Sequence, residues 1–510
     1  MNATSILILI TIIAYLAMVV FIGFKYSKQN KGADDFYLGG RRLGPFVTAM
    51  SAEASDMSSW LLLGLPGVAY ISGLADASWT AIGLAVGTYL NWLIVAKKIR
   101  RYSIKVNAIT VPEFFTNRYH DAKKILQTVA AIVIVIFFIP YTGSGFAACG
   151  KLFNSLFGMD YHTAMIVSAI VIAIYTSLGG FLAASTTDFI QSIVMTVAII
   201  VVFGFGVSVA GGWNAVMDNA SALPGYLSLT SIHDAVAGTA SNYSVLTICS
   251  TLAWGLGYFG MPHILLRFMA ARKEEELTFS RRIASVWVVI SMAVAIFIGV
   301  VGLAMSGVGA IVKLEGSNSE TVLVKIAQLL STNGWICAII CGVILAGVLA
   351  ATMSTADSQL LAAASSITED ILTSKFGVKF SEKKQMMTAR IAVLVISLFG
   401  MIIAWNPDSS VFKIVSFAWA GFGAAFGPIV LLALFWKRSN LQGAIAGMIT
   451  GGAMIFIWKF VIAKLGGAFA IYELLPAFII ALIVNVVVSL LTKAPSDEIN
   501  KEFEEVKAGN

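Results

Sequence analysis

The segment Ser51–Ser59, Ser-Ala-Glu-Ala-Ser-Asp-Met-Ser-Ser, places two carboxylates and four hydroxyls in the middle of an otherwise apolar stretch, 46–71. That stretch is long enough to cross a bilayer. A charged side chain at the bilayer centre costs at least ~2.5 kcal/mol, so such residues in a membrane helix usually serve a function. Gly64, Pro66 and Gly67 follow, and they weaken the hydrogen bonding of a regular helix. A polar span that can break is typical of the ion or substrate site of a transporter.

Apolar residues make up 58% of the 510 residues, charged residues make up 12%, and the mean hydropathy is +0.87. A soluble domain carries about 25% charged residues. The chain is therefore predicted to be an all-α polytopic membrane protein embedded in the lipid bilayer. Runs of ~20 apolar residues, enough to span the hydrocarbon core, recur along the chain, and we count about thirteen: 5–24, 46–71, 78–96, 125–150, 162–180, 188–210, 245–268, 283–306, 324–357, 388–405, 411–436, 441–462 and 473–492.

The basic residues lie mainly in alternate loops. The loops after spans 1, 3, 7, 9 and 11 and the C-terminal tail hold all of the 34 Lys and Arg residues except Lys151, Lys313, Lys325, Lys413, Lys459 and Lys464. The positive-inside rule places these loops in the cytoplasm. In the cell membrane the N-terminus is then outside and the C-terminus inside, as an odd number of spans requires. The basic residues form no single patch, so the net charge of +7 does not indicate nucleic-acid binding.

The cysteines and histidines show no spacing typical of a metal site or an enzyme. All four cysteines lie in predicted spans, where free cysteine behaves as a small packing residue. The histidines are scattered, and no hydrolase, metalloprotease or nucleotide-binding motif stands on suitable secondary structure. We therefore predict neither an enzymatic activity nor a cofactor. The tail, 493–510, is expected to form a short, frayed, charged helix.

A second interrupted span contains Trp254-Gly-Leu-Gly-Tyr-Phe-Gly-Met-Pro262, with three glycines and a proline in nine residues. Close helix packing through glycine is one explanation. A discontinuous helix at a binding site is the other. Two broken helices five spans apart are typical of inverted-repeat transporters, whose unwound backbone holds substrate and ion near the midplane. Spans 2–6 and 7–11 would then form the two repeats.

Hydroxyl groups line one face of the ninth span. Ala351, Ser354, Thr355 and Ser358 are spaced i, i+3, i+4 and i+7, so they share a helix face. Such hydroxyls often bond to carbonyls four residues back or join neighbouring helices. Opposite a broken helix they can instead complete a cage of oxygens, the donor set that a hard cation such as Na⁺ prefers.

Motifs along almost the whole chain resemble the sodium:solute symporter family, and within it the branch that carries proline with sodium. The matching stretches are Tyr37-Leu-Gly-Gly-Arg41, Leu43-Gly-Pro-Phe-Val-Thr-Ala49, Ala54-Ser-Asp-Met-Ser58, Gly179-Gly-Phe-Leu-Ala183, Trp254-Gly-Leu-Gly-Tyr-Phe-Gly260, Pro262-His263, Met353-Ser-Thr355, Ile367-Thr-Glu-Asp370 and Trp419-Ala-Gly-Phe-Gly-Ala-Ala-Phe-Gly-Pro428. The resemblance implies sodium-coupled symport of L-proline by alternating access. It also implies a LeuT-like 5+5 core. The corresponding parts are 1–45 with the first span and its loop, 46–210 and 245–436 as the repeats, 437–492 with two extra spans, and 493–510 as the tail.

The resemblance carries over roles for individual residues. The sodium ligands would be Ala54, Met57, Ala351, Ser354 and Thr355. The residues implied in coupling the ion are Asp56, Ser58, Arg41 on the cytoplasmic side and Asp188 near the ion's inward path. The substrate pocket and its gates would use Ser58, Tyr141, Trp254, Tyr258 and Pro262.

The proline pattern is not matched everywhere: Glu53, Ser59, Met261 and Asp357 depart from it. Because Met261 adjoins the pocket, sodium-coupled uptake of another small solute, such as pantothenate or another carboxylate, is the alternative. Asp357 has two interpretations. In the first it faces a watery inward cavity or pairs with a cytoplasmic basic residue; in the second it shares a second, inner cation with Asp188. A channel would need a stripe of polar residues repeated along its pore, and a membrane enzyme would need a cluster of catalytic residues. The sequence shows neither pattern.

The chemistry of the predicted pocket suits a zwitterion such as proline. Free N–H groups at a helix N-terminus can hold the carboxylate. The ring would pack on Trp254 and Tyr258, and the ammonium could make cation–π contact with them. We expect no arginine within the spans.

Overall fold

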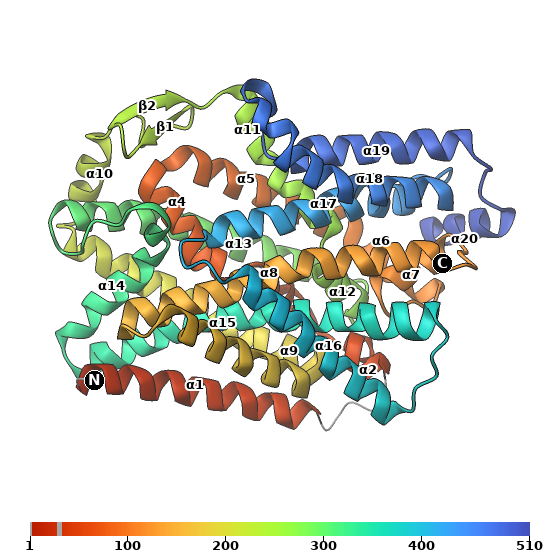
Figure 1. Ribbon diagram of the computed structural model, residues 1–510, viewed down its shortest axis with the longest axis horizontal. Coiled ribbons are helices and arrows are strands. Elements are labelled where there is room, and N and C mark those ends of the chain that lie inside the picture. Colours follow the sequence, from red (N-terminus) through yellow and green to blue (C-terminus); the bar gives the residue numbers. More distant parts are fainter. Residues whose placement is uncertain (1–2, 28–32, 510) are drawn as a thin grey trace.

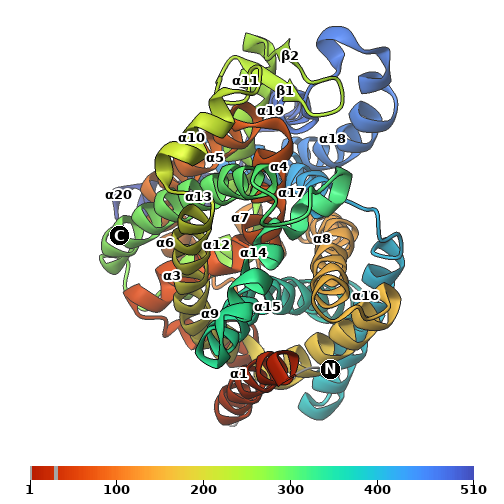
Figure 2. The same cartoon turned by 90° about the vertical axis from the view of Figure 1, so that its left-hand side faces the viewer.

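Most of the chain forms long helices that run roughly parallel to one another (Figure 1). The computed structural model describes residues 3–27 and 33–509. Lys28 and Lys31, predicted to be cytoplasmic, lie outside the described residues. In Figure 1 the N- and C-terminal ends lie at opposite ends of the bundle. Figure 2, which looks along the bundle, places α1 (Ala3–Ser27) at one edge and α18 (Leu441–Phe460) and α19 (Leu474–Leu491) at the other.

The remaining elements include short 3₁₀ and π segments, which carry the label η. In chain order they are α2 Ala33–Leu38, η1 Gly39–Arg41, α3 Pro45–Asp56, η2 Trp60–Gly64, α4 Leu65–Ser72, α5 Leu74–Leu90, η3 Asn91–Val95, α6 Ala96–Lys105, α7 Val111–Arg118, α8 Ile125–Phe157, α9 Tyr161–Val209, α10 Trp213–Ser221, β1 Ser231–Asp234, β2 Thr239–Asn242, α11 Val245–Leu252, η4 Ala253–Gly260, α12 Pro262–Ala270, α13 Glu276–Gly307, η5 Gly316–Thr321, α14 Val322–Leu330, η6 Ser331–Asn333, α15 Trp335–Ser365, η7 Ser366–Lys375, α16 Glu382–Ile403, α17 Val411–Phe435, η8 Ile462–Leu465, η9 Gly467–Phe469 and α20 Asp497–Ala508.

Ten helices of the described chain are long and apolar enough to cross a membrane, and one bent pair, Val245–Gly260 with Pro262–Ala270, would make eleven. Two shorter apolar helices, Trp60–Ser72 and Tyr161–Ile174, overlap predicted spans 2 and 5. Large apolar side chains such as Phe21 and Leu398 stay exposed on the outside of the bundle. An outer surface of this kind suits contact with lipid rather than water. The chain is therefore a helical polytopic membrane protein.

Two predicted span boundaries lie near glycines with positive φ; the end of span 5 agrees with the structure, and the start of span 9 was wrong. Predicted span 5 ends at 180, and α9 consists of two helices that meet there, at a kink at Gly180, where φ is 71°. Predicted span 9 began at 324, but α14 is a separate helix, and α15 starts after Gly334, where φ is 110°. Glycine reaches positive φ without steric cost, so it can turn the chain without a long loop.

The chain is not entirely helical, because β1 and β2 form an antiparallel hairpin in which Ser231 faces Asn242. The hairpin lies at the same end of the bundle as the N-terminus (Figure 1). Asp234 stabilises its turn, since its Oδ1 accepts from the N–H groups of Val236 and Ala237 at 2.9 Å. The expected all-α class thus holds for the membrane-crossing part and not for this loop.

The C-terminal tail is docked, not frayed as expected. Phe503 and Val506 of α20 are buried. Arg101 donates from Nη1 to the carbonyl oxygen of Val506 at 2.7 Å. Lys105 Nζ lies 2.6 Å from Glu505 Oε2, and this hydrogen bond lowers the pKa of Glu505. An amphipathic helix with a charged face can dock in this way on basic loops, which the tail's composition alone did not reveal.

Candidate functional site

The polar segment of the sequence coincides with a break in a buried helix. Helix α3 ends at Asp56, and Met57 has φ −77° and ψ 69°, outside the helical region. The chain resumes in the π segment η2 and continues as α4. Ser58 sits in the break, where its Oγ accepts from the N–H of Trp60 at 3.3 Å. A helix broken in this way leaves backbone carbonyls free to bind a cation.

The glycine-rich segment forms a second break. The 3₁₀ segment η4 ends at Gly260, Met261 is extended with φ −77° and ψ 108°, and Pro262 starts α12 at a bend of 46°. Gly255 also packs directly against the backbone of Gly83 and leaves no room for a Cβ atom there. The segment is therefore both a discontinuous helix and a close glycine contact, and the binding site at this break stays a prediction.

Four of the five predicted sodium ligands meet where α3 crosses α15. Ser354 donates from Oγ to the carbonyl oxygen of Ala54 at 2.8 Å and to that of Ala351 at 3.2 Å. Thr355 Oγ1 also donates to Ala351 O, at 3.2 Å. Met57 lies beyond them, in the break itself, with its N–H bonded to Glu53 O at 2.7 Å.

This donor set fits Na⁺. It consists of carbonyl and hydroxyl oxygens, and the residues that supply them are at most 3% exposed. Hard cations prefer such oxygens to nitrogen or sulfur. Among the described residues no group of three or more His, Cys, Asp or Glu could hold a metal ion.

An acidic residue and three aromatic side chains adjoin these oxygens. Asp56 accepts a 2.5 Å hydrogen bond at Oδ2 from the hydroxyl of Tyr258 in η4. Its backbone carbonyl accepts from Trp60 Nε1 at 3.1 Å and from the hydroxyl of Tyr141 at 3.4 Å. Asp56 thus connects the first break with the second break and with α8.

Trp254 forms the next part of this aromatic cluster. Its ring stacks on Tyr472, with centroids 5.2 Å apart and an interplanar angle of 23°. Phe412 lies 5.3 Å from it on another side. Trp419 donates from Nε1 to Trp254 O at 2.7 Å and meets the Tyr258 ring edge-on at 5.1 Å. These rings make an apolar surface next to Asp56, as a ligand with an apolar ring and a charged end requires.

The model of the sodium:solute symporter family matches residues 36–451 of this chain. The chain belongs to the sodium:solute symporter family. It is 41% identical to the sodium/proline symporter of Escherichia coli (strain K12), over 99% of this chain and 97% of that protein. It is 38% identical to the sodium/proline symporter of Staphylococcus aureus, over 98% and 95%.

Solved structures of other transporters share the fold. A Na⁺-coupled sialic acid symporter in a substrate-bound, outward-open state has a TM-score of 0.78 and 19% identity, covering 96% of this chain and 98% of that one. A nucleobase-cation-symport-1 family transporter in a closed conformation has a TM-score of 0.55 and 13% identity, covering 94% and 99%. These neighbours make the fold of this symporter-family chain LeuT-like.

Within this family member, the other predicted site residues lie in different surroundings. Pro262 is buried at the start of α12. The hydrogen bonds of Arg41 go to residues outside the predicted site. Arg41 donates from Nη1 to Met269 O at 2.7 Å and from Nη2 to Ala108 O at 2.6 Å. It therefore joins η1 to the end of α12 and to the segment that precedes α7.

Several residues of the site were missed at the sequence level. Trp419 lies inside one of the family motifs, and Trp60 directly follows the polar segment Ser51–Ser59. Their aromatic side chains at these positions could have indicated that they belong to the site. Phe412 and Tyr472 had none, because they lie in no motif and reach Trp254 from distant parts of the chain.

The expectation that no arginine lies within the spans was wrong. Arg267 belongs to α12, and its side chain is 1% exposed. Position 267 stands at the very end of predicted span 7, 245–268, and was assigned to the loop that follows. Helix α12 continues to Ala270, so Arg267 lies inside the bundle. Its Nη2 lies 3.1 Å from Asp188 Oδ2, and the Asp188 side chain is fully buried.

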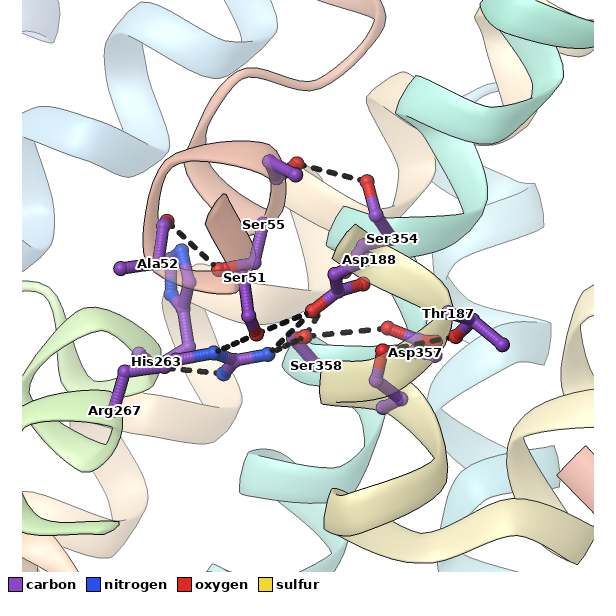
Figure 3. A network of polar contacts seen from close by, with 12 residues as sticks. Ser51, Ala52, Ser55, Thr187, Asp188, His263, Arg267, Ser354, Asp357 and Ser358 are labelled. Carbon is purple, nitrogen blue, oxygen red and sulfur yellow. Dashed lines mark hydrogen bonds and ion pairs between the residues drawn. The ribbon is translucent and has the colours of Figure 1, made fainter. Parts of the chain in front are cut away.

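Asp357 lies beside this pair, and it does not face a watery cavity, since it is 1% exposed. Its Oδ1 accepts from the hydroxyl of Ser358 at 3.2 Å. Figure 3 shows Asp357, Ser358, Asp188, Arg267 and Ser51 as one polar network below Ser354. The predicted coupling residues Asp188 and Asp357 thus belong to one cluster.

Proposed function

We propose that this chain carries L-proline into the cell together with Na⁺ by alternating access. The observation that carries the proposal is the position of Asp56. It lies two residues beyond Ala54, whose carbonyl meets Ser354, and its carboxylate holds Tyr258 of the aromatic cluster. Ion and solute would therefore share one helix break. The names of the relatives, at 38–41% identity over nearly the whole chain, support proline and sodium as the pair.

Sodium would bind to the carbonyls of Ala54, Met57 and Ala351 and to the hydroxyls of Ser354 and Thr355. Binding would draw α3 and α15 together and fix Asp56 at the end of α3. Asp56 Oδ1 has no hydrogen-bond partner among the described residues, and it is buried. A buried carboxylate oxygen is costly to leave unpaired, so it favours a nearby cation, either the sodium ion or the ammonium of the substrate.

The solute's ring would pack against Trp254 and Tyr258, and Ser58, Tyr141 and Pro262 would border it. An aromatic wall also allows cation–π contact with the secondary ammonium of proline. Met261 is fully buried beside Pro262. Its side chain would determine whether the pocket takes proline or, as in the alternative, a larger carboxylate solute.

We further propose thirteen spans, with the N-terminus outside and the C-terminus in the cytoplasm. The repeats would be 46–210 and 245–436, flanked by 1–45 and by the two extra spans in 437–492. The opposite ends of the bundle reached by the two termini support an odd number (Figure 1). The basic loops next to the docked tail support the orientation.

Purified protein in proteoliposomes should take up labelled proline only when sodium is present. A membrane potential of 100 mV, negative inside, supplies ~2.3 kcal/mol for each positive charge that enters, which allows roughly 50-fold accumulation of proline. Uptake is compared in sodium and in choline buffer with no proton gradient. Equal uptake in both buffers contradicts sodium coupling, and competition by pantothenate but not by proline favours the alternative solute.

Gly257→Ala should lower proline uptake at subsaturating proline by about fivefold or more, because overpacking costs ~1–3 kcal/mol. A Cβ at Gly257 would overlap the indole of Trp419, which borders Tyr258. Gly204→Ala is the matched control, since nothing lies within 4 Å of its Cβ position. Initial uptake rates of both variants are compared at equal amounts of protein in the membrane. Equal rates in the two variants mean that the aromatic cluster does not touch the solute.

A further inference from the structure

Three helices direct buried oxygens at one point on the C-terminal side of the sodium residues on α15. Ser51 comes from α3, Asp188 from α9 and Ser358 from α15. All three contact the guanidinium of Arg267: Nε donates to Ser51 Oγ at 3.0 Å, and Nη2 donates to Asp188 Oδ2 at 3.1 Å and to Ser358 Oγ at 2.6 Å. Two hydroxyl oxygens and a carboxylate oxygen thus surround one positive charge, and such oxygens are the usual ligands of a cation site.

The cation in this site is the guanidinium of Arg267, which is part of the chain itself. Arginine cannot lose its proton in a protein, so its charge is permanent. The side chains of Arg267 and Asp188 are at most 1% exposed, and a buried charge must be paired. Ser51 completes the pairing, since its hydroxyl donates to Asp188 Oδ2 at 2.7 Å while accepting from Arg267. The remaining Nη1 donates to the carbonyl of His263 at 2.9 Å.

The cluster is joined to the residues proposed to bind sodium. Ser358 donates to the carbonyl of Ser354 at 2.9 Å, and Ser354 donates to Ala54 O at 2.8 Å. One turn of α15 therefore separates the two sites. A small cavity adjoins the cluster: Arg267 and Ser358 line it, together with Tyr37, Phe181, Leu361 and Ser365.

We propose that the guanidinium of Arg267 is a built-in cation that takes the place of a second coupled sodium ion in the Ser51, Asp188 and Ser358 site. This inference rests on the proposed sodium-coupled function. Asp357 adjoins Ser358, and its Oδ2 has no hydrogen-bond partner among the described residues. A free cation could therefore draw on two carboxylates there once the guanidinium is gone. With Arg267 present, the chain couples one sodium ion to each solute molecule.

The test counts bound sodium with ²²Na⁺ on purified protein, with no solute present. The unmodified protein should bind one ion and Arg267→Ala two, because alanine leaves the oxygens of Ser51, Asp188 and Ser358 without their cation. Arg272→Ala is the matched control. It removes a neighbouring arginine whose partner is the carboxylate of Glu276 on the surface, and it should bind one ion. Sodium activation of proline uptake should change from hyperbolic to sigmoidal in Arg267→Ala alone.

Two ions bound to the unmodified protein, or one ion bound to a folded Arg267→Ala, would overturn the proposal. The double variant Arg267→Ala/Asp188→Asn guards against a single variant that fails to fold. Losing both charges is far less costly than losing one, so the double variant should fold and bind one ion. A double variant that binds two ions, or that does not fold, counts against the proposal. Because no solute is used in the binding measurement, a wrong choice of substrate leaves its result unaffected.

Discussion

Thr355→Ala raises the sodium concentration for half-maximal proline uptake by about tenfold or more, because a hydrogen-bonding group that faces a charge contributes ~1.5–3 kcal/mol. Thr355 Oγ1 lies on the face of α15 that meets Ala54 and already bonds to Ala351 O at 3.2 Å. Alanine is well tolerated in a helix, so the protein should remain folded. The measurement is initial uptake at saturating proline over a range of sodium concentrations.

Thr352→Ala is the control for this change. Thr352 is equally buried in α15, but its Oγ1 bonds back to Val348 O at 3.1 Å and takes no part in the proposed site. It should keep its sodium dependence, whereas Asp56→Ala, at the end of α3, should behave like Thr355→Ala. If the sodium dependence of Thr355→Ala is unchanged, the oxygens of α15 do not bind the coupling ion.

Trp254→Ala and Tyr258→Ala raise the proline concentration for half-maximal uptake at saturating sodium by about tenfold. Losing a buried aromatic wall costs ~1–3 kcal/mol. Tyr258→Ala also removes the 2.5 Å hydrogen bond to Asp56, so its effect should extend to sodium. Uptake is measured against proline concentration at fixed sodium, and then against sodium concentration.

Tyr258→Phe separates these two contributions, because it keeps the ring and removes only the hydroxyl. It should retain most of the proline affinity and lose sodium affinity. Trp213→Ala is the control, since the ring contacts of Trp213 are with Phe203 and Phe297, which do not belong to the proposed site. If the proline concentration for half-maximal uptake is the same in Trp254→Ala and Trp213→Ala, Trp254 does not form an aromatic wall around the solute.

The sequence by itself determined the local features of this transporter. The polar segment Ser51–Ser59 predicted a break, and α3 ends there at Asp56. The hydroxyl stripe of α15 followed from helical periodicity, and Ser354 does face Ala54. Both local inferences succeed because a lipid environment penalises unpaired polar groups, so a polar segment within a span has to find partners inside the bundle.

Single glycines marked the limit of this local reasoning. Gly334 separates α15 from α14 and the short η6, so predicted span 9, 324–357, covers two helices. Hydropathy averages over about twenty residues and cannot resolve a turn at one position. The docked helix α20 was missed because the residues that pair with it, on α6 and in the loop after α17, are distant in the sequence.

Only the tertiary structure decided what surrounds the site. Tyr472 and Phe412 reach Trp254 from the last third of the chain, and no local pattern predicts such a meeting. Arg267 is the clearest case. Its position in the sequence suggested a cytoplasmic loop, yet it is buried because Asp188 and two hydroxyls, from three other helices, balance its charge. A buried charge is stable only with its partners in place, and those partners come together only when the helices pack.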